Sequence, residues 1–86
     1  FSETNTVKIF PNPAKDFINI DFGDFDKMKG CYIKLINSLS QIELVSQVTQ
    51  KQMTIDVSSL SGRGIYLVQI VNNKDKILAV RKIVLE

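Results

Sequence analysis

Histidine is absent from this sequence of 86 residues, and cysteine occurs once, at Cys31. Without His and with a single Cys, neither a tetrahedral zinc site nor a Ser–His or Cys–His pair can be assembled. Cys31 lies in an apolar strand pattern, so we expect a small buried hydrophobe that forms no intrachain disulfide. The run Gly62-Arg63-Gly64 lacks the spacing and the Lys-Ser/Thr ending of a phosphate-binding loop. The sequence therefore predicts a protein that is not an enzyme and needs no cofactor.

Long apolar runs and concentrated charge are also missing. No segment approaches the ~20 apolar residues needed to cross a membrane, so no membrane insertion is expected. The net charge of +2 is distributed over residues of both signs from Lys8 to Lys82. A nucleic-acid binder would concentrate its basic residues on one face, so nucleic acid is not an expected partner.

Tryptophan is absent, and only seven residues are Phe or Tyr. A carbohydrate-binding sandwich needs an exposed aromatic platform. The alternation of the apolar pattern assigns Phe10, Phe22 and Tyr66 to inward positions and leaves Phe25 and Tyr32 as the plausible exposed rings. Two separated rings are weak support for a glycan-binding surface.

Three carboxylates, Asp21, Asp24 and Asp26, crowd one segment and could hold a hard cation through oxygen ligands. Their spacing does not match an EF-hand, and Lys27 and Lys29 follow immediately. An ordinary charged connection between strands is the favoured interpretation, with a cation site as the alternative.

Short apolar segments with period-two alternation recur about every ten residues, separated by turn residues. This spacing is typical of a sandwich or barrel rather than of βαβ units. A helix over 41–51 is the competing interpretation of one segment, but its Val and Thr content favours a strand. The prediction is an all-β fold, a seven-stranded Ig-like antiparallel β-sandwich with strands at 7–10, 17–22, 31–36, 42–48, 53–57, 65–71 and 76–85.

Details of the pattern give further expectations. Pro11 and Pro13 should place the first strand at an edge or crossing point, because proline donates no ladder hydrogen bond. In the fourth strand Ile42, Leu44 and Val48 should share one side. The segment 23–30 is expected to be a charged connection without regular structure.

The segment from Leu60 to Tyr66 resembles the tyrosine corner of Ig-like sandwiches. Gly64 permits a tight bend, and Tyr66 then enters the next strand. We expect the ring to pack inward and its hydroxyl to bond nearby backbone, which makes Tyr66 architectural.

Several blocks in order resemble one family, the type A C-terminal sorting domain of the type IX (Por) secretion system of Bacteroidetes. The resemblance covers residues 7–86, and the blocks together are more specific than any one of them. They are VKIFPNPA at 7–14, FINI at 17–20, IKLINSLSQ at 33–41, IDVSSL at 55–60, GIYLV at 64–68 and RKIVL at 81–85. The residues that match the family motif, in roles expected to be structural, are Pro11, Asn12, Pro13, Gln41, Leu60, Gly64 and Tyr66.

Two turns depart from the family pattern. Ser40 stands where the family usually has Gly, which costs roughly 1–2 kcal/mol if that position needs a left-handed backbone. The turn at 72–75 also lacks Gly, and Asn73 is the residue expected to adopt the left-handed conformation there.

The resemblance implies a secretion address. Residues 1–6 would be a linker to an upstream cargo domain, and 7–86 the C-terminal sorting domain. The implied partners are an outer-membrane translocon, its shuttle protein, and a surface sortase that cuts in or just before 1–6. The cargo would be exported through the periplasm to the cell surface or the medium. Recognition in the family depends on the last strand, which makes five residues the candidate translocon-recognition element: Arg81, Lys82, Ile83, Val84 and Leu85.

An edge strand offers unpaired backbone groups to a partner, which gives that recognition a physical route. Alternatively, Arg81 and Lys82 protect the edge against aggregation. Two rival functions stay open: an Ig-like adhesive or carbohydrate-binding module that persists on a cell-surface protein, and an inert β spacer between domains.

Overall fold

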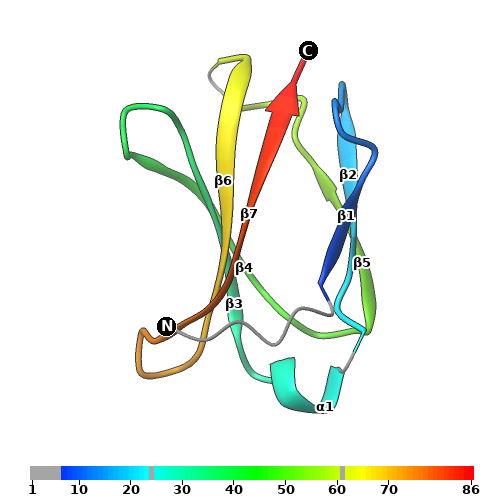
Figure 1. Cartoon of the computed structure of the whole chain (residues 1–86), viewed down its shortest axis with the longest axis vertical. Helices are drawn as coiled ribbons and strands as arrows, with labels where there is room; N and C mark the ends of the chain where they lie inside the picture. Colours follow the sequence, from blue (N-terminus) through cyan, green and yellow to red (C-terminus); the bar gives the residue numbers. More distant parts are fainter. Residues whose placement is uncertain (1–6, 24, 61) are drawn as a thin grey trace.

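The computed structural model describes residues 7–23, 25–60 and 62–86, and nearly all of their regular secondary structure is β-strand (Figure 1). One short helix, α1 (Phe25–Met28), interrupts the strand order. The strands in chain order are β1 (Lys8–Phe10), β2 (Phe17–Asp21), β3 (Tyr32–Ile36), β4 (Ile42–Gln47), β5 (Gln52–Asp56), β6 (Gly64–Val71) and β7 (Ile77–Leu85).

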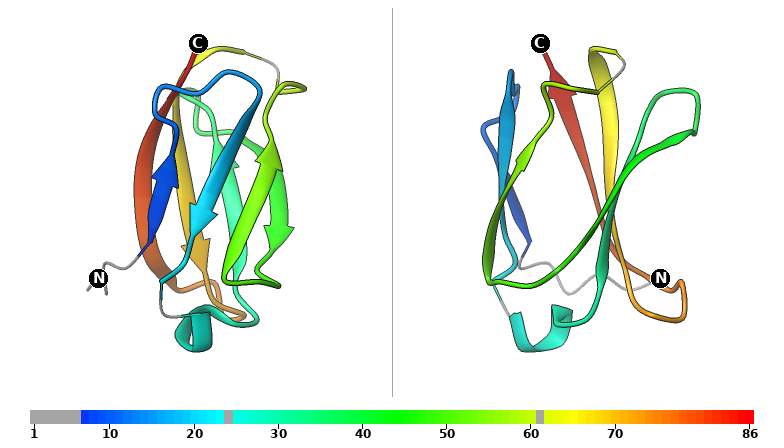
Figure 2. Two further views of the ribbon diagram at one scale, coloured as in Figure 1. Left: turned by 90° about the vertical axis from the view of Figure 1, so that its right-hand side faces the viewer. Right: turned by 180° about the vertical axis from the view of Figure 1, so that it is seen from behind.

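The strands form two antiparallel sheets that pack face to face (Figure 2). One sheet has three strands in the order β1-β2-β5, and the other has four in the order β4-β3-β6-β7. This arrangement confirms the prediction of a seven-stranded antiparallel β-sandwich. The segment 41–51 contains β4, so the helical interpretation of it is wrong.

The core lies between the sheets and follows from the period-two alternation of the strands. Ile18 and Ile20 of β2 are fully buried, as are Ile33 and Leu35 of β3, while the residues between them face outward. Cys31 is also buried, as expected, and burial raises the pKa of its thiol.

Phe10 was assigned to the interior, and this prediction is wrong. In β1 the residue opposite Ile20 is Ile9, and Phe10 lies opposite the outward Asn19. Its side chain is 49% exposed. Alternation fixes the outcome: Val7 and Ile9 face the core, so Phe10 must face solvent.

Ile42 does not share a side with Val48, contrary to the prediction. A β-bulge between Leu35 and Ile36 shifts the register, so that Ile42 lies opposite Ile36 and is 53% exposed. A bulge adds a residue to one strand and reverses the phase of the alternation beyond it. Leu44 packs partly buried against the core, and Val48 is buried.

The connection between β2 and β3 contains α1, which the sequence analysis did not anticipate. The turn of helix carries Met28 into the core at 1% exposure and lays Phe25 against it. The expectation that the Phe25 ring is exposed is therefore wrong, because this ring is partly buried. Tyr32, the other ring expected to be exposed, is 37% exposed.

Two hairpins use the same turn, in which an asparagine side chain organises the backbone. In the β3–β4 turn the Asn37 Oδ1 accepts hydrogen bonds from the backbone N–H groups of Leu39 and Gln41, both at 2.9 Å. The fourth residue, Ser40, has a φ of 65°. Ser40 thus has the left-handed backbone on which the expected cost of a non-glycine residue depends.

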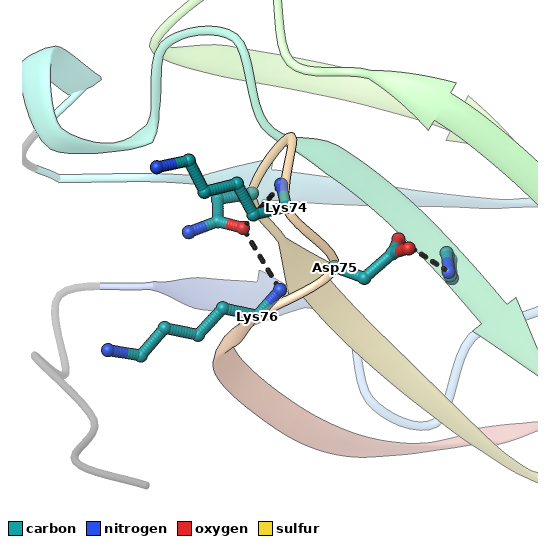
Figure 3. A network of polar contacts seen from close by, with 5 residues as sticks. Lys74, Asp75 and Lys76 are labelled. Atoms are coloured by element: carbon teal, nitrogen blue, oxygen red, sulfur yellow. Dashed lines mark hydrogen bonds and ion pairs between the residues drawn. The ribbon is translucent and has the colours of Figure 1, made fainter.

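In the β6–β7 turn Asn72 Oδ1 likewise accepts from the backbone N–H groups of Lys74 and Lys76, at 2.8 and 2.9 Å (Figure 3). The left-handed residue is Asp75, with a φ of 62°, and not Asn73 as predicted. Asp75 also lies 3.8 Å from Lys34 Nζ, and because the Asp75 side chain is 90% exposed this ion pair contributes little. The position three residues after the asparagine, rather than residue type, selects the left-handed conformation.

Candidate functional site

β7, the strand expected to carry recognition, lies at the edge of the four-stranded sheet and pairs with β6 along its length. Its side chains divide between the two faces. Ile83 and Leu85 are buried at 1% and 2% exposure, so both belong to the core. Lys82 is exposed and Val84 partly exposed on the outer face. Of the five candidate residues, two therefore serve packing directly.

Arg81 lies at the junction of the two sheets. Its Nε donates to the backbone carbonyl of Val7 at 3.2 Å, and its Nη1 donates to the carbonyl of Val80 at 2.9 Å. The side chain thus links β7 to the segment that enters β1.

The free side of β7 is closed at its C-terminal half by the segment from Asn12 to Ala14. The Asn12 side chain donates from Nδ2 to the carbonyl of Lys82 at 3.2 Å and accepts at Oδ1 from the N–H of Val84 at 3.0 Å. Asn12 thereby provides the donor and acceptor that a neighbouring strand would supply.

Ala14 completes this closure with backbone groups. Its N–H donates to the carbonyl of Val84, its carbonyl accepts from the N–H of Glu86, both at 2.8 Å, and it forms a parallel bridge with Leu85. We call Asn12–Ala14 with its four hydrogen bonds to β7 and Glu86 the edge clamp. The two X-Pro bonds of this region, preceding Pro11 and Pro13, are cis.

The sequence singled out Asn12 as a motif residue but gave no indication of its contact with Val84, 72 positions away. Only the fold brings the two together. The sequence signal for this contact is the pair of prolines on either side of Asn12. Proline has no backbone N–H to donate, whereas the Asn12 side chain can both donate and accept a hydrogen bond.

The remaining motif residues are structural. Gly64 has a φ of 113°, and a Cβ there would meet no atom within 4 Å, so glycine is required by the backbone and not by space. Leu60 packs against the core. Gln41 accepts at Oε1 from Asn37 Nδ2 at 3.1 Å, inside the β3–β4 turn.

Tyr66 forms the predicted corner. Its ring is buried, and its hydroxyl accepts from the N–H of Gly62 at 3.3 Å. The same hydroxyl lies 3.0 Å from the carbonyl of Gly62 and 3.2 Å from Glu43 Oε2, and it donates to one of these at a time. It thereby ties the β5–β6 connection to β4.

The alternative of a cation site at Asp21, Asp24 and Asp26 is not tested as a whole, because Asp24 lies outside the described residues. Within the described residues no group of three potential ligands is close enough to hold a metal ion. Asp21 instead accepts from the N–H of Gly23 at 2.9 Å and from Gln52 Nε2 at 3.2 Å. Both hydrogen bonds lower the pKa of the Asp21 carboxyl, and the one donated by Gly23 has the larger effect.

A family model described as the secretion system C-terminal sorting domain matches residues 8–86. The chain belongs to this family. No curated protein matches the chain. The domain is accordingly a type IX secretion sorting signal, of a family that is not an enzyme family and that forms the C-terminal tail of exported cargo proteins.

A solved structure supports the fold. PorZ of Porphyromonas gingivalis, described as an essential bacterial surface component of the type IX secretion system, matches with a TM-score of 0.73 at 16% sequence identity. The match covers 99% of this chain and 12% of the PorZ chain, so the sorting domain corresponds to a small part of that protein. Among the described residues, no helix is long and apolar enough to span a membrane.

Proposed function

We propose that residues 7–86 direct an attached cargo across the outer membrane through an outer-membrane translocon and its shuttle protein. A surface sortase then removes the domain by cutting in or just before residues 1–6, and the cargo, having passed through the periplasm, reaches the surface or the medium. Membership of the sorting-domain family supports this function. The observation that carries the role of the last strand is the edge clamp, which fixes β7 in one conformation with Lys82 and Val84 directed outward.

A fixed strand suits a recognition element because binding then costs less conformational entropy than ordering a free tail. Arg81, Ile83 and Leu85 contribute by holding that strand in place. In this proposal the partner contacts the side chains of Lys82 and Val84. The other three residues of the recognition element hold these two in position.

The test is a transport assay in a bacterium that possesses type IX secretion. An exported fluorescent reporter carries residues 1–86 at its C-terminus, and its distribution between periplasm, surface and medium is measured. Truncation after Arg81 would remove the buried Ile83 and Leu85 and is expected to unfold the domain, so a loss of export would be ambiguous.

The sharper variant is Lys82→Ala, in which an exposed side chain is removed and the core stays intact. Lys74→Ala, an exposed lysine in the β6–β7 turn, is the matched control. The proposal expects the Lys82 variant to be retained in the periplasm while the control is exported. Retention of the unaltered fusion, although folded, would refute the sorting function in that host.

A second candidate function, glycan binding, is favoured by one observation. Phe10 is 49% exposed and lies on the outer face of the three-stranded sheet, opposite Asn19. Its ring lines a hollow of about 370 Å³ together with Asn19 and Thr54, among others. A phenyl ring beside amide and hydroxyl groups can stack on a sugar while those groups hydrogen-bond to it. A glycan array probed with the domain and with its Phe10→Ala variant tests this alternative.

A further inference from the structure

The edge clamp restricts how a partner can bind the last strand. In β7 the backbone groups of residues 82, 84 and 86 that face away from β6 already bond Asn12 or Ala14. A strand added alongside this part of β7 would have to displace the clamp. A partner that engages the folded domain there must therefore contact side chains on the sheet's outer face.

That outer face carries an unusual concentration of exposed aliphatic side chains. Ile42, Val45 and Ile65 are 53%, 56% and 51% exposed, and Leu67 is 37% exposed. Monomeric proteins rarely expose contiguous apolar patches of several large residues without a binding role. We define the aliphatic face as Ile36, Ile42, Val45, Ile65, Leu67 and Val84.

The strand register shows that these side chains are neighbours. Ile42 of β4 lies opposite Ile36 of β3, which lies opposite Leu67 of β6. Leu67 in turn lies opposite Lys82 of β7, so one row crosses all four strands. In the adjacent row Ile65 lies opposite Val84, which joins the aliphatic face to the candidate recognition strand.

The outward charged side chains of these four strands are lysines. Lys34 lies opposite Val45 at one side of the aliphatic row and is 3.8 Å from the Asp75 carboxylate of the β6–β7 turn, whereas Lys82 ends the row on β7. The single carboxylate in β3, β4, β6 and β7 is that of Glu43, which turns away to bond the buried Tyr66 and Asn37. The face therefore combines an apolar centre with cationic side chains and presents no carboxylate from its own strands.

From this combination we propose that the aliphatic face is the docking surface for a protein of the export apparatus. The partner would present apolar side chains opposite Ile65 and Leu67 and carboxylates opposite Lys82. This inference rests on the proposed sorting function and adds to it: the partner reads a folded four-stranded surface and not an open strand edge.

Charge and composition favour this occupant over two others. In a symmetric pair of copies, Lys82 of each face would meet no carboxylate from the strands of the other face. A membrane-surface site combines aromatic or leucine side chains with many basic residues, whereas the strands of this face carry two outward lysines, one of them beside Asp75.

The experiment uses the reporter fusion described above with Ile65→Glu and Val45→Glu, together and singly. Both positions are about half exposed, so the substitutions are compatible with folding, which thermal unfolding of each variant verifies. Phe17→Glu places the same change at equal exposure on the outer face of the other sheet and is the matched control. Export of the double variant should fall by about tenfold or more, the loss typical of central interface residues, with the control unchanged.

The outcomes separate the two proposals. Export of every variant at the unaltered level overturns the docking surface and leaves the sorting function standing. Retention of the unaltered fusion overturns both. Binding to anionic lipid vesicles, or self-association in sedimentation velocity, that Ile65→Glu abolishes would overturn the protein partner in favour of a membrane or a second copy. Selective loss of export with neither of those effects supports the proposal.

Discussion

Replacing Asn12 by Ala tests whether the edge clamp stabilises the last strand. The change removes two hydrogen bonds to β7, one to the carbonyl of Lys82 at 3.2 Å and one from the N–H of Val84 at 3.0 Å. A net hydrogen bond contributes about 0.5–1.5 kcal/mol, and both here are near the surface. We therefore expect the free energy of unfolding to fall by about 1–2 kcal/mol, a sizeable share of the roughly 5–15 kcal/mol of a domain this size.

Two measurements check this expectation. Urea denaturation gives the change in the free energy of unfolding. Amide hydrogen exchange should show faster exchange at Val84, whose N–H loses its acceptor, than at Ile83, which lies in the β6 ladder.

Two further variants sharpen the interpretation. Asn73→Ala removes an exposed asparagine from the β6–β7 turn and should change stability by no more than a few tenths of a kcal/mol. Asn12→Asp keeps the acceptor for Val84 but loses the donor to Lys82, so it should also destabilise. If Asn12→Ala matched the unaltered domain in both stability and Val84 exchange, the clamp would contribute nothing and the argument for a closed edge would fail.

Three other substitutions give independent checks by chemical denaturation. Ser40→Gly should raise the free energy of unfolding by about 1 kcal/mol because it relieves a left-handed backbone, and a decrease would contradict this. Tyr66→Phe should lower it by about 1–2 kcal/mol through the lost hydroxyl contacts to Gly62, and an unchanged value would make the corner dispensable. The Asp56 carboxylate accepts hydrogen bonds from the Ser58 hydroxyl and from the Ser58 backbone N–H. Both lower the pKa of the carboxyl, the hydroxyl more than the N–H. The stabilisation from these hydrogen bonds is present above the ordinary carboxyl pKa of about 4 and is lost as pH falls through the lower folded-state pKa. The free energy of unfolding of Asp56→Asn should therefore depend less steeply on pH in acid. An equal slope for the variant and the unaltered domain would refute this.

Alternation and turn chemistry were sufficient to predict the strands. β2 and β3 have the buried and exposed positions that period two assigns, because each strand covers one face of a two-layer core. Ser40 was singled out because the resembled family usually has Gly at this turn position, and its φ of 65° lies in the region that favours glycine. These features are local, and local sequence determines them.

The errors arose where a non-local contact decides the outcome. The bulge that exposes Ile42 depends on how β4 pairs with β3, which no window of sequence contains. Phe10 faces solvent because the pairing of β1 with β2 places Ile9 opposite the inward Ile20, and this pairing sets the phase of the alternation in β1. The clamp joins Asn12 to Val84 across almost the whole chain.

The last strand cannot act as a tag independent of the domain. Ile83 and Leu85 are core residues, and loss of either large side chain from a core costs about 2–5 kcal/mol. Both together approach the stability of the whole domain. The ladder to β6 and the hydrogen bonds of Asn12 to Lys82 and Val84 hold this strand from two sides. Any variant that detaches the strand therefore also unfolds the sheet that presents Lys82, so a partner that requires this strand is expected to discriminate folded from unfolded cargo tails.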